Sequence, residues 1–506
     1  MAIDNITVLV SCVCALLLWA VRKSARRAPL PPMPQSSWIP FVGNAFQISL
    51  TQPWITFTEW GQEFGPVYMY HMFGANFLVL NTVEAAQDLL HERFKNYSER
   101  PRQIMVCELM GWKFDFALQN FSNPLYHIFR QIFVRELSSH AMNAFRDSIT
   151  HATRICLDRL LSSPAEFEKH LTDQVVGANM AIAYGYPDAT STDTHVEVAN
   201  RAQASAIDAL RAGNIWLVDI FPVLRYIPDW FPGANFKRVA RKGRELVEDM
   251  RSGTLEWSLK HYQDGKMQTS FFTKLMEMHE GGSIGLDIVR DSCATFHPVA
   301  TDTTTAAIMI FVLAMLHAPD VQKRAQEALD SVTGGQRLPE FSDRTSLPYI
   351  DAVVKEVLRW QTVVPLGLPH VALEDDVYNG MLIPAGTIIL PNQYAMAHDE
   401  SVYPEPHRFN PERFLGPDKQ RDPDTSAFGF GARVCPGRHL AQLILWLDFA
   451  CILSCFTIER PKDDLGAEYL PPTNLTNGLT SRPEAFQCRF VPRPGWSTII
   501  QDSAVL

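Results

Sequence analysis

Residues 428–441 read FGFGARVCPGRHLA and place a single cysteine, Cys435, in a glycine-rich turn. The glycines are Gly429, Gly431 and Gly437. Glycine lets a backbone turn tightly and approach a flat ligand closely. The apolar run 442–453 follows and predicts a buried helix with Pro436 at its first position, where a missing N–H is harmless. Cys435 is therefore expected at a helix N-terminus, where free N–H groups and the helix dipole favour the thiolate and prepare the sulfur to bind a metal.

Cys435 also has two plainer interpretations. A lone cysteine is usually an ordinary buried side chain. Cys435 and His439 would otherwise form half of a zinc site. Neither interpretation requires Phe428 and Arg433 beside the glycines, and no second Cys/His pair stands nearby in the sequence.

The stretch resembles the heme-binding loop of the cytochromes P-450, the heme-thiolate monooxygenases. Every position of the family pattern Phe-x-x-Gly-x-Arg-x-Cys-x-Gly is met, at Phe428, Gly431, Arg433, Cys435 and Gly437. The resemblance implies that Cys435 is the axial ligand of the iron of heme b and that Arg433 pairs with a heme propionate. A thiolate ligand pushes electron density toward the iron and favours cleavage of the O–O bond.

The same resemblance implies further contacts to the heme. Arg100, in NYSERPR, matches an arginine that reaches a propionate, although a surface arginine fits the sequence nearly as well. His370 would also approach a propionate. Where relatives carry Trp-Arg-x-x-Arg, this chain carries Tyr126 and Arg130, so a tyrosine hydroxyl would donate in place of the tryptophan.

Residues 286–317 predict a long apolar helix that contains VATDTT at 299–304. This resembles the family's central helix, whose Ala/Gly-Gly-x-Asp/Glu-Thr motif places an acid and an alcohol beside dioxygen. On that match Asp302 and Thr303 relay protons, because acid–base groups must lie within hydrogen-bonding reach of the reacting atom. Taken alone the triplet is a weak signal, since a helical threonine often bonds to a carbonyl one turn back.

The central helix departs from the family at two positions. Ala300 stands where relatives have glycine, and Pro298 lies inside the helix. Proline offers no N–H to the carbonyl of Ala294 and crowds it, so a local kink is expected. We hypothesise that Pro298 supplies part of the opening that glycine helps to provide in relatives.

Residues 347–360 predict a helix that carries Glu356 and Arg359 on one face. Alone, this is an ordinary ion pair that contributes little. Arg413, in PERF, and then Cys435 follow in the order of the family's Glu-x-x-Arg, proline-arginine-phenylalanine block and heme loop. The resemblance implies a buried network of Glu356, Arg359 and Arg413 with a structural role.

A substrate pocket is assigned to apolar residues from four segments. The segment 105–116 resembles fungal members of the family and is assigned to a loop over the pocket, although core packing explains its aromatic residues equally well. A proline-broken strand at 363–370 and a turn within 470–483 would close the pocket. The assigned residues are Met110, Trp112, Phe114, Phe296, Val364, Leu366 and Leu479. They suit a terpenoid, steroid-like or aromatic substrate.

The chain begins with an apolar run, 6–21, that is followed by Arg22, Lys23, Arg26 and Arg27. The run is short for an ordinary bilayer and suits the thinner endoplasmic reticulum. Because the basic residues follow it, a retained single-pass anchor is favoured over a cleaved signal peptide. Positive flanks stay cytosolic, which puts the catalytic domain in the cytosol and makes Asn5, in Asn-Ile-Thr, a luminal glycosylation acceptor.

The expected organisation is an anchor with its basic flank at 1–27, a proline-rich hinge at 28–44, and a catalytic domain at 45–506. That domain is expected to be mainly α with small β-sheets, the cytochrome P-450 fold. The 506 residues, 46% of them hydrophobic, can bury a large core. Nine scattered cysteines indicate a reducing compartment, and the net charge of −10 argues against nucleic-acid binding.

The implied reaction is monooxygenation, in which one atom of dioxygen enters an apolar substrate and the other becomes water. Electrons would come from a separate membrane-bound NADPH reductase that holds the flavins, and Arg130 and Arg438 would help to dock its acidic surface. A heme-thiolate isomerase or dehydratase that does not use dioxygen is a second class, and a non-catalytic heme-binding membrane protein is a third. Asp302 and Thr303 argue against the second. Dependence of a product on NADPH and dioxygen separates all three.

Overall fold

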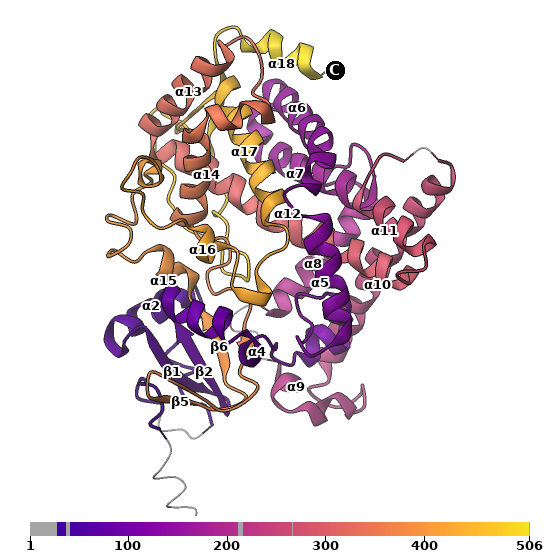
Figure 1. Ribbon diagram of the computed structural model, residues 1–506, viewed down its shortest axis with the longest axis vertical. Helices are drawn as coiled ribbons and strands as arrows, with labels where there is room; N and C mark the ends of the chain where they lie inside the picture. Colours follow the sequence, from indigo (N-terminus) through magenta and orange to yellow (C-terminus); the bar gives the residue numbers. More distant parts are fainter. Residues whose placement is uncertain (1–27, 37–40, 211–215, 266, 505–506) are drawn as a thin grey trace, which may run out of the picture.

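The computed structural model describes residues 28–36, 41–210, 216–265 and 267–504. A large helical body lies beside a smaller part built around a four-stranded sheet (Figure 1). The prediction of a mostly helical fold with small sheets is confirmed. The predicted anchor and Asn5 lie outside the described residues.

The helical body is organised around α12, which spans Leu286–His317 as the sequence predicts. It packs against α7 (Phe167–Tyr184) and α17 (Arg438–Cys455). Phe311 of α12 stacks on Phe449 of α17 with ring centroids 3.9 Å apart. In the described part, α12 and α17 are apolar and long enough to span a membrane, yet 78% of the apolar stretch in each is buried inside the protein, as in core helices.

Further helices surround α12, and several begin with a proline, whose missing N–H is harmless in a first turn. They are α5 (Pro124–Glu136), α6 (Arg146–Ser162), α8 (Thr194–Leu210), α9 (Leu217–Ile220), α10 (Asn235–Gln263), α11 (Phe271–Glu280), α13 (Pro319–Thr333), α14 (Pro348–Trp360), α16 (Asp424–Ala427) and α18 (Trp496–Ala504). The predicted helix at 347–360 is thus confirmed as α14. Short helices on the sheet side are α2 (Pro53–Phe64), α3 (Val83–Ala86), α4 (Phe94–Tyr97) and α15 (Gln393–Ala397).

The main sheet begins with an antiparallel pair, β1 (Val67–Met72) and β2 (Ala75–Leu80). Gly74 turns the chain between them with a φ of +79°. β6 (Ile388–Pro391) runs parallel to β2, and β3 (His370–Val371) pairs with the far side of β6. This order places His370 at the edge of the sheet that borders the helical body.

Residues 376–383 form a short hairpin. β4 (Asp376–Tyr378) and β5 (Met381–Ile383) form it around Gly380, and β6 leaves it to join β2 in the main sheet, where its side chains are buried. The segment 363–369 forms turns instead of the predicted strand. A third sheet pairs β7 (Phe456–Glu459) with β8 (Arg489–Pro492).

The described part of the proline-rich hinge packs along the sheet. The carbonyl of Pro32 accepts a hydrogen bond from the amide of Met69 in β1 at 2.9 Å. The carbonyl of Pro29 accepts one from the amide of Leu382 in β5 at 2.7 Å. Extended proline-rich backbone leaves its carbonyls unpaired, so they are available to the strands. This part of the hinge is docked on the domain.

Candidate active site

Cys435 lies in a closed loop directly before α17. Its backbone N–H donates to the carbonyl of Phe428 at 2.7 Å and so joins the two ends of the loop. The predicted position of Pro436 is wrong, because α17 begins at Arg438 and Gly437 is its N-cap. The loop, rather than the first helical turn, therefore sets the direction of the cysteine.

Gly431 is required by the packing of this loop. It has a φ of +53°, and a Cβ at this position would lie 2.2 Å from the carbonyl oxygen of Leu90 and 2.9 Å from the Cα of His91. Both atoms belong to the backbone of a π-helical turn, η1 (Gln87–Glu92), which cannot yield cheaply. A Cβ at Gly437 would meet only the Sγ of Cys435 among the described residues, at 3.8 Å. Gly437 thus keeps the space beside the sulfur open.

Burial raises the pKa of the Cys435 thiol. The backbone N–H groups of Gly437 and Arg438 and the charges of Arg130 and Arg438 act in the opposite direction. These groups at the helix N-terminus favour the thiolate in the direction that the sequence predicts, but desolvation outweighs them. A metal ion deprotonates the thiol that binds it, and this supplies the missing stabilisation.

Arg100 is buried, with 9% of its surface exposed, so it is not the surface arginine that the sequence left open. Its guanidinium donates to the backbone carbonyls of Ala117, Leu368 and Pro369 at 3.0, 2.9 and 2.7 Å. Burial, reinforced by the charge of Arg433, lowers the pKa of Arg100 to about 9. The side chain is held in place by neutral groups alone.

Arg433 has a similar environment. It donates to the carbonyl of Ser98 at 2.8 Å and to that of Gln119 at 2.6 Å. Its guanidinium carbon lies 4.1 Å from the centre of the Tyr126 ring. Burial lowers the pKa of Arg433. Stacking on the tyrosine fixes the plane of the guanidinium group without neutralising it.

We call Arg100, Arg433 and His370 the cationic cluster. The Nδ1 of His370 lies 2.7 Å from the carbonyl oxygen of Tyr97, and burial with the charge of Arg100 holds the pKa of His370 well below its usual value. Among the described residues no carboxylate lies within ion-pair distance of either arginine of the cluster. Buried guanidinium groups that cannot shed their protons require an anion. The two propionates of heme fit this requirement.

Tyr126 and Arg130 project from α5 and support the heme loop. The Tyr126 hydroxyl donates to the carbonyl of Ala432 at 2.8 Å, and Arg130 donates to that of Val434 at 2.6 Å. Burial lowers the pKa of Arg130. The sequence predicts that both side chains reach propionates, whereas the structure directs these hydrogen bonds to loop carbonyls on either side of Arg433.

One turn of the central helix, at residues 299–303, is accessible to solvent, and we call it the open turn. Val299 is 43% exposed although Phe296 and Thr301 beside it are buried. Asp302 and Thr303 are half-buried on the same turn. The Thr303 hydroxyl donates to the carbonyl of Val299 at 2.9 Å, the bond one turn back that the sequence left as an alternative. Asp302 makes no hydrogen bond or ion pair with any residue that the structure describes, so its carboxylate is available for another partner.

Glu356, Arg359 and Arg413 form a buried charge network behind the heme loop. The Nε and Nη2 of Arg359 donate to the two carboxylate oxygens of Glu356 at 2.7 and 2.8 Å. The Nε of Arg413 lies 3.4 Å from the same carboxylate. The amide of Asn410 donates to Glu356 at 2.7 Å, and Arg359 donates to the carbonyl of Ala397 at 3.0 Å. We refer to these three charged residues as the charge network.

The family model described as Cytochrome P450 matches residues 31–488. The chain belongs to the cytochrome P450 family. It is 36% identical over 499 residues to "Tryptamine 4-monooxygenase" of Psilocybe cyanescens, a match that covers 96% of this chain and 98% of the relative. It is also 36% identical over 501 residues to "Cytochrome P450 monooxygenase 98" of Postia placenta, covering 97% of this chain and 95% of the relative. "Cytochrome P450 monooxygenase claR" of Ampulloclitocybe clavipes matches at 36% over 479 residues, with 92% and 87% covered.

These relatives are monooxygenases, so this P450 is an oxidoreductase that incorporates oxygen. Membership implies heme iron with a thiolate ligand, and it implies dioxygen, a substrate and a redox partner. The zinc alternative finds no ligands, because no group of three or more His, Cys, Asp or Glu side chains among the described residues is placed to hold a metal ion.

Four of the seven residues assigned to the P450 substrate pocket pack in hydrophobic clusters, and their place in the pocket stays a prediction. Met110 and Trp112 lie in a buried cluster with side chains of α8 and α10. The ring of Phe296 lies 5.3 Å from that of Phe271 in the main core. Leu366 packs against the apolar face of the main sheet. Large apolar side chains gain most from complete burial, which explains why packing rather than the pocket claims them.

Val364 and Leu479 are placed differently, because their two loops meet. The amide of Ser481 donates to the carbonyl of Val363 at 2.8 Å. Val364 and Leu479 are both half-buried. These side chains, like Val299 of α12, keep part of their apolar surface accessible.

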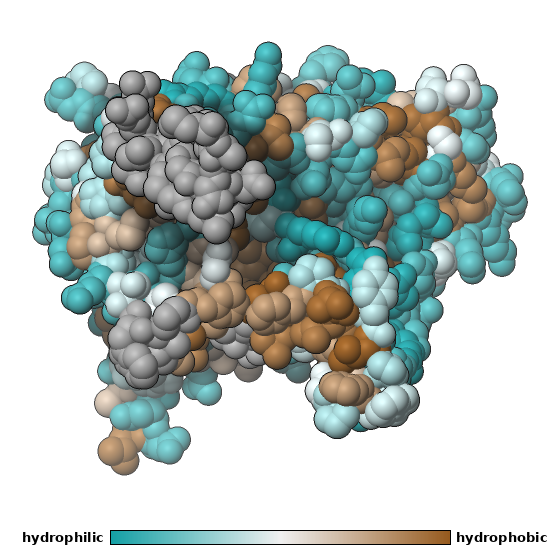
Figure 2. Space-filling model, turned by 90° about the horizontal axis from the view of Figure 1, so that it is seen from below, coloured by the Kyte–Doolittle hydropathy of each residue, from teal (hydrophilic) through white to brown (hydrophobic). Residues whose placement is uncertain are grey.

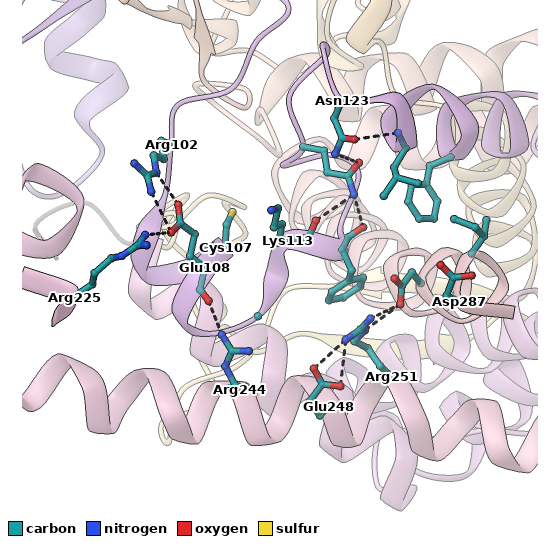
Figure 3. A pocket seen from close by; sticks show the side chains of 17 residues that line it. Arg102, Cys107, Glu108, Lys113, Asn123, Arg225, Arg244, Glu248, Arg251 and Asp287 are labelled. Carbon is teal, nitrogen blue, oxygen red and sulfur yellow. Dashed lines mark hydrogen bonds and ion pairs between the residues drawn. The ribbon is translucent and has the colours of Figure 1, made fainter. Parts of the chain in front are cut away.

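Phe114, the remaining residue, lines a cleft of about 730 Å³ on the outside of the molecule (Figure 3). The guanidinium of Arg251 lies 4.8 Å from its ring centre and pairs with Asp291 at 2.6 Å. Across the cleft, Glu108 pairs with Arg102 and Arg225 at 2.7 and 2.8 Å (Figure 3). The mixed charges make this cleft unlike an apolar reaction pocket.

Sequence reasoning missed a buried polar group beside the open turn. Asn179 of α7 donates to the Thr301 hydroxyl at 3.2 Å, and that hydroxyl lies 3.3 Å from the Nδ1 of His297. Burial lowers the pKa of His297 to about 4, so the ring is neutral. An asparagine and a histidine inside otherwise apolar helices are the signal that would have found this group.

Proposed function

We propose that this P450 inserts one oxygen atom into an apolar organic substrate, with Cys435 as the axial thiolate and with Asp302 and Thr303 as proton-transfer groups. The observation that carries the proposal is the open turn of α12. An unpaired carboxylate and a hydroxyl share the exposed turn of a helix that is otherwise buried. Such a pair has a use in proton transfer and none in packing.

When bound, the heme supplies the iron at which dioxygen is activated by incoming electrons. Arg100, Arg433 and His370 orient it through its propionates. The Asp302 carboxylate takes a proton from water and passes it toward the site. The Thr303 hydroxyl must release the carbonyl of Val299 before it can donate inward, at a cost of about 1 kcal/mol for one hydrogen bond.

Apolar side chains define the substrate side of the site. Val299, Val364 and Leu479 exclude water and favour a terpenoid, steroid-like or aromatic molecule. The relative named for tryptamine makes indoles a rational first group in a substrate panel.

The first test is the absorption spectrum of the reduced, carbon-monoxide-bound protein. A long-wavelength Soret band that is lost in Cys435→Ala and retained in Cys107→Ala supports the thiolate assignment. Cys107 is a suitable control because it is a half-buried cysteine on another loop. Absence of the band in the unmodified protein would refute the assignment.

Product formation separates the enzyme classes. Oxidised product should require both NADPH with a reductase and dioxygen, and Asp302→Asn should lower product per NADPH consumed. A product that forms without dioxygen would instead indicate an isomerase or dehydratase. The NADPH reductase would dock near the heme loop, where Arg438 is exposed, whereas Arg130 is half-buried and already bonded to Val434.

The proposal places the P450 on a membrane of the endoplasmic reticulum through the anchor at 6–21, with the catalytic domain in the cytosol. Exposed apolar residues at the end of the molecule that carries α9 support this: Phe41, Phe46, Leu50, Leu217, Phe221, Val223, Tyr226, Trp230 and Phe231. Figure 2 views the molecule from below and shows hydrophobic residues gathered across this face. Phe41 stacks on Phe221 at 5.8 Å between ring centroids, which joins the two halves of the patch.

Membrane contact is tested by fractionation. Replacement of Trp230 and Phe231 by serine should release part of an anchor-deleted protein from the membrane fraction, since an exposed aromatic patch contributes interfacial affinity. Glycosylation at Asn5 would show that the N-terminus is luminal. It would be detected as a loss of glycan mass in Asn5→Gln relative to the protein with its natural sequence. Trp216 is no part of this surface, because its indole donates to the carbonyl of Ala209 at 2.9 Å and packs inside.

A further inference from the structure

Two successive carbonyls of α12 accept hydrogen bonds from side chains. The amide Nε2 of Gln203 in α8 donates to the carbonyl of Pro298 at 2.9 Å. The hydroxyl of Thr303 donates to the carbonyl of Val299 at 2.9 Å. In a regular α-helix these two carbonyls serve the backbone N–H groups of residues 302 and 303. Side-chain donors at such positions tilt the carbonyls outward and open the turn.

Pro298 weakens the preceding step of the same helix. It has no N–H for the carbonyl of Ala294, and its ring crowds that carbonyl. The structure keeps α12 continuous through Pro298, so the helix tolerates the defect instead of ending there. Gln203 supports this turn from the neighbouring helix α8. Its hydrogen bond to Pro298 can keep the turn open although Ala300 stands where relatives have glycine.

The helix that carries Gln203 also reaches the substrate side. Ile207 stands four residues after Gln203, so both side chains lie on one face of α8. A Cβ at Gly478 would lie 3.9 Å from the Cγ2 of Ile207, which places Ile207 against the turn that carries Leu479. One face of α8 therefore touches both the turn beside the substrate and the open turn of α12.

We propose that Gln203 is a positioning residue that couples occupancy of the substrate pocket to the turn carrying Asp302 and Thr303. The inference rests on the proposed function of that turn. A substrate that displaces Leu479 or Ile207 moves α8, and the Gln203 amide transmits the movement to the carbonyl of Pro298. With the bond made, the turn is open and Thr303 can exchange partners. With the bond lost, the Pro298 carbonyl would accept only from the N–H of Asp302 and the turn would tighten.

Three variants test the coupling. Gln203→Leu removes the donor, and Gln203→Glu keeps the length of the side chain but replaces the donating amide by a carboxylate. Gln62→Leu makes the same chemical change at an exposed position of α2 and is the matched control. The reduced carbon-monoxide spectrum of each full-length variant is recorded first. A long-wavelength band shows that the heme site is intact, whereas its absence from the unmodified protein would refute the proposed function itself.

The decisive readout is the infrared stretching band of bound carbon monoxide, which responds to polar groups at the open turn. Gln203→Leu and Gln203→Glu should shift this band, and Gln62→Leu should not. Thr303→Ala should shift it as well, and the Gln203→Leu/Thr303→Ala double variant should shift it by less than the sum, because both changes act on one turn. A normal carbon-monoxide spectrum with an unshifted infrared band in both Gln203 variants would overturn the inference and leave the proposed function standing.

A second readout measures coupling with a substrate obtained from the panel. Gln203→Leu should raise the hydrogen peroxide released per NADPH consumed severalfold, while substrate affinity from the spectral shift changes less than about twofold. A purely structural role would instead alter affinity, heme content and coupling together. Equal peroxide release in the unmodified protein and both Gln203 variants would contradict the proposal.

Discussion

The charge network contains two buried arginines and the cationic cluster contains buried Arg100 beside half-buried Arg433, but the two groups are completed in different ways. In the charge network, Glu356 lies between Arg359 and Arg413 and accepts hydrogen bonds from both. In the cationic cluster, Arg100 and Arg433 are bonded to backbone carbonyls. The first is satisfied within the chain. In the second, no described carboxylate forms an ion pair with either arginine, and the buried carboxylates of Asp115 and Glu99 act on them only from a longer distance. This leaves both guanidinium groups able to pair with anions that arrive with a ligand.

The distinction matters because a buried carboxyl can lose its charge and a buried arginine cannot. A buried carboxyl can become neutral by taking up a proton, whereas an arginine keeps its charge at ordinary pH. Asp448 of α17 can become neutral by taking up a proton, because burial raises its pKa to about 8. Arg100 and Arg433 cannot become neutral in this way, so an external anion would stabilise them.

The largest expected effect breaks the charge network. Glu356→Gln leaves two buried arginines without their carboxylate and should lower the free energy of unfolding by roughly 3–5 kcal/mol. Urea unfolding followed by circular dichroism measures it. Glu327→Gln is the control, because its pair with Lys323 is exposed and 4.0 Å long, and should change stability by less than about 0.5 kcal/mol. Equal effects of the two substitutions would show that burial of the charge network has no energetic consequence.

The next prediction concerns the cationic cluster. Arg433→Gln removes a charge but keeps an amide that can donate to the same carbonyls. Heme retention should fall about 10- to 100-fold, as for residues that support a metal site, with little change in urea unfolding. The rate of heme loss to a scavenger protein measures retention. If stability fell as in Glu356→Gln while heme loss stayed normal, the cluster would be structural and the comparison would fail.

The pH dependence of stability tests whether Asp448, unlike the arginines, loses its charge on burial. Its Oδ1 accepts a hydrogen bond from the Thr153 hydroxyl at 2.7 Å, and its pKa rises from 3.8 to about 8 on burial. The folded chain therefore binds a proton that the unfolded chain releases between these values, and stability falls as pH rises from about 4 to 8. The slope is about 1.4 kcal/mol per pH unit.

Asp448→Asn should remove this slope. Its stability relative to the unmodified protein should increase between pH 6 and pH 7, measured by urea unfolding at each pH. A constant difference across this range would mean that Asp448 is ionised in the folded protein.

The smallest predicted effect concerns the departure at Tyr126. Tyr126→Phe removes the hydrogen bond to Ala432 but keeps the ring beneath Arg433, so it should weaken heme retention by about 1 kcal/mol. The same heme-loss assay measures it, with Arg433→Gln as the reference. A loss as large as that of Arg433→Gln would show that the hydroxyl contacts the heme directly.

Several parts of the site were predictable because they depend on local sequence. The loop around Cys435 is fixed by glycine positions, and Gly431 is needed where the π turn at Leu90 approaches. The bounds of α12 follow from a long apolar run. Glu356 and Arg359 meet because they are three residues apart on one helix. In each case the relevant contact or pattern spans few residues.

Other parts depended on packing between distant segments. The placement of Met110, Trp112 and Phe296 in the core could not be read from their hydrophobicity, because pockets and cores use the same residue types. Strand β6 pairs with β2, which lies about 310 residues earlier in the chain, instead of extending the neighbouring hairpin of β4 and β5. Desolvation raises the pKa of the Cys435 thiol, an effect of packing that its position before a helix does not reveal.

The sequence by itself determined the family, the heme loop, the central helix and the order of the three charged motifs. Only the tertiary structure decided that Arg100 and Arg433 lie close to each other while no described carboxylate forms an ion pair with either, and that Gln203 reaches the carbonyl of Pro298. Motif and periodicity are properties of neighbouring residues, whereas desolvation and hydrogen bonding between helices are set by which surfaces meet after folding.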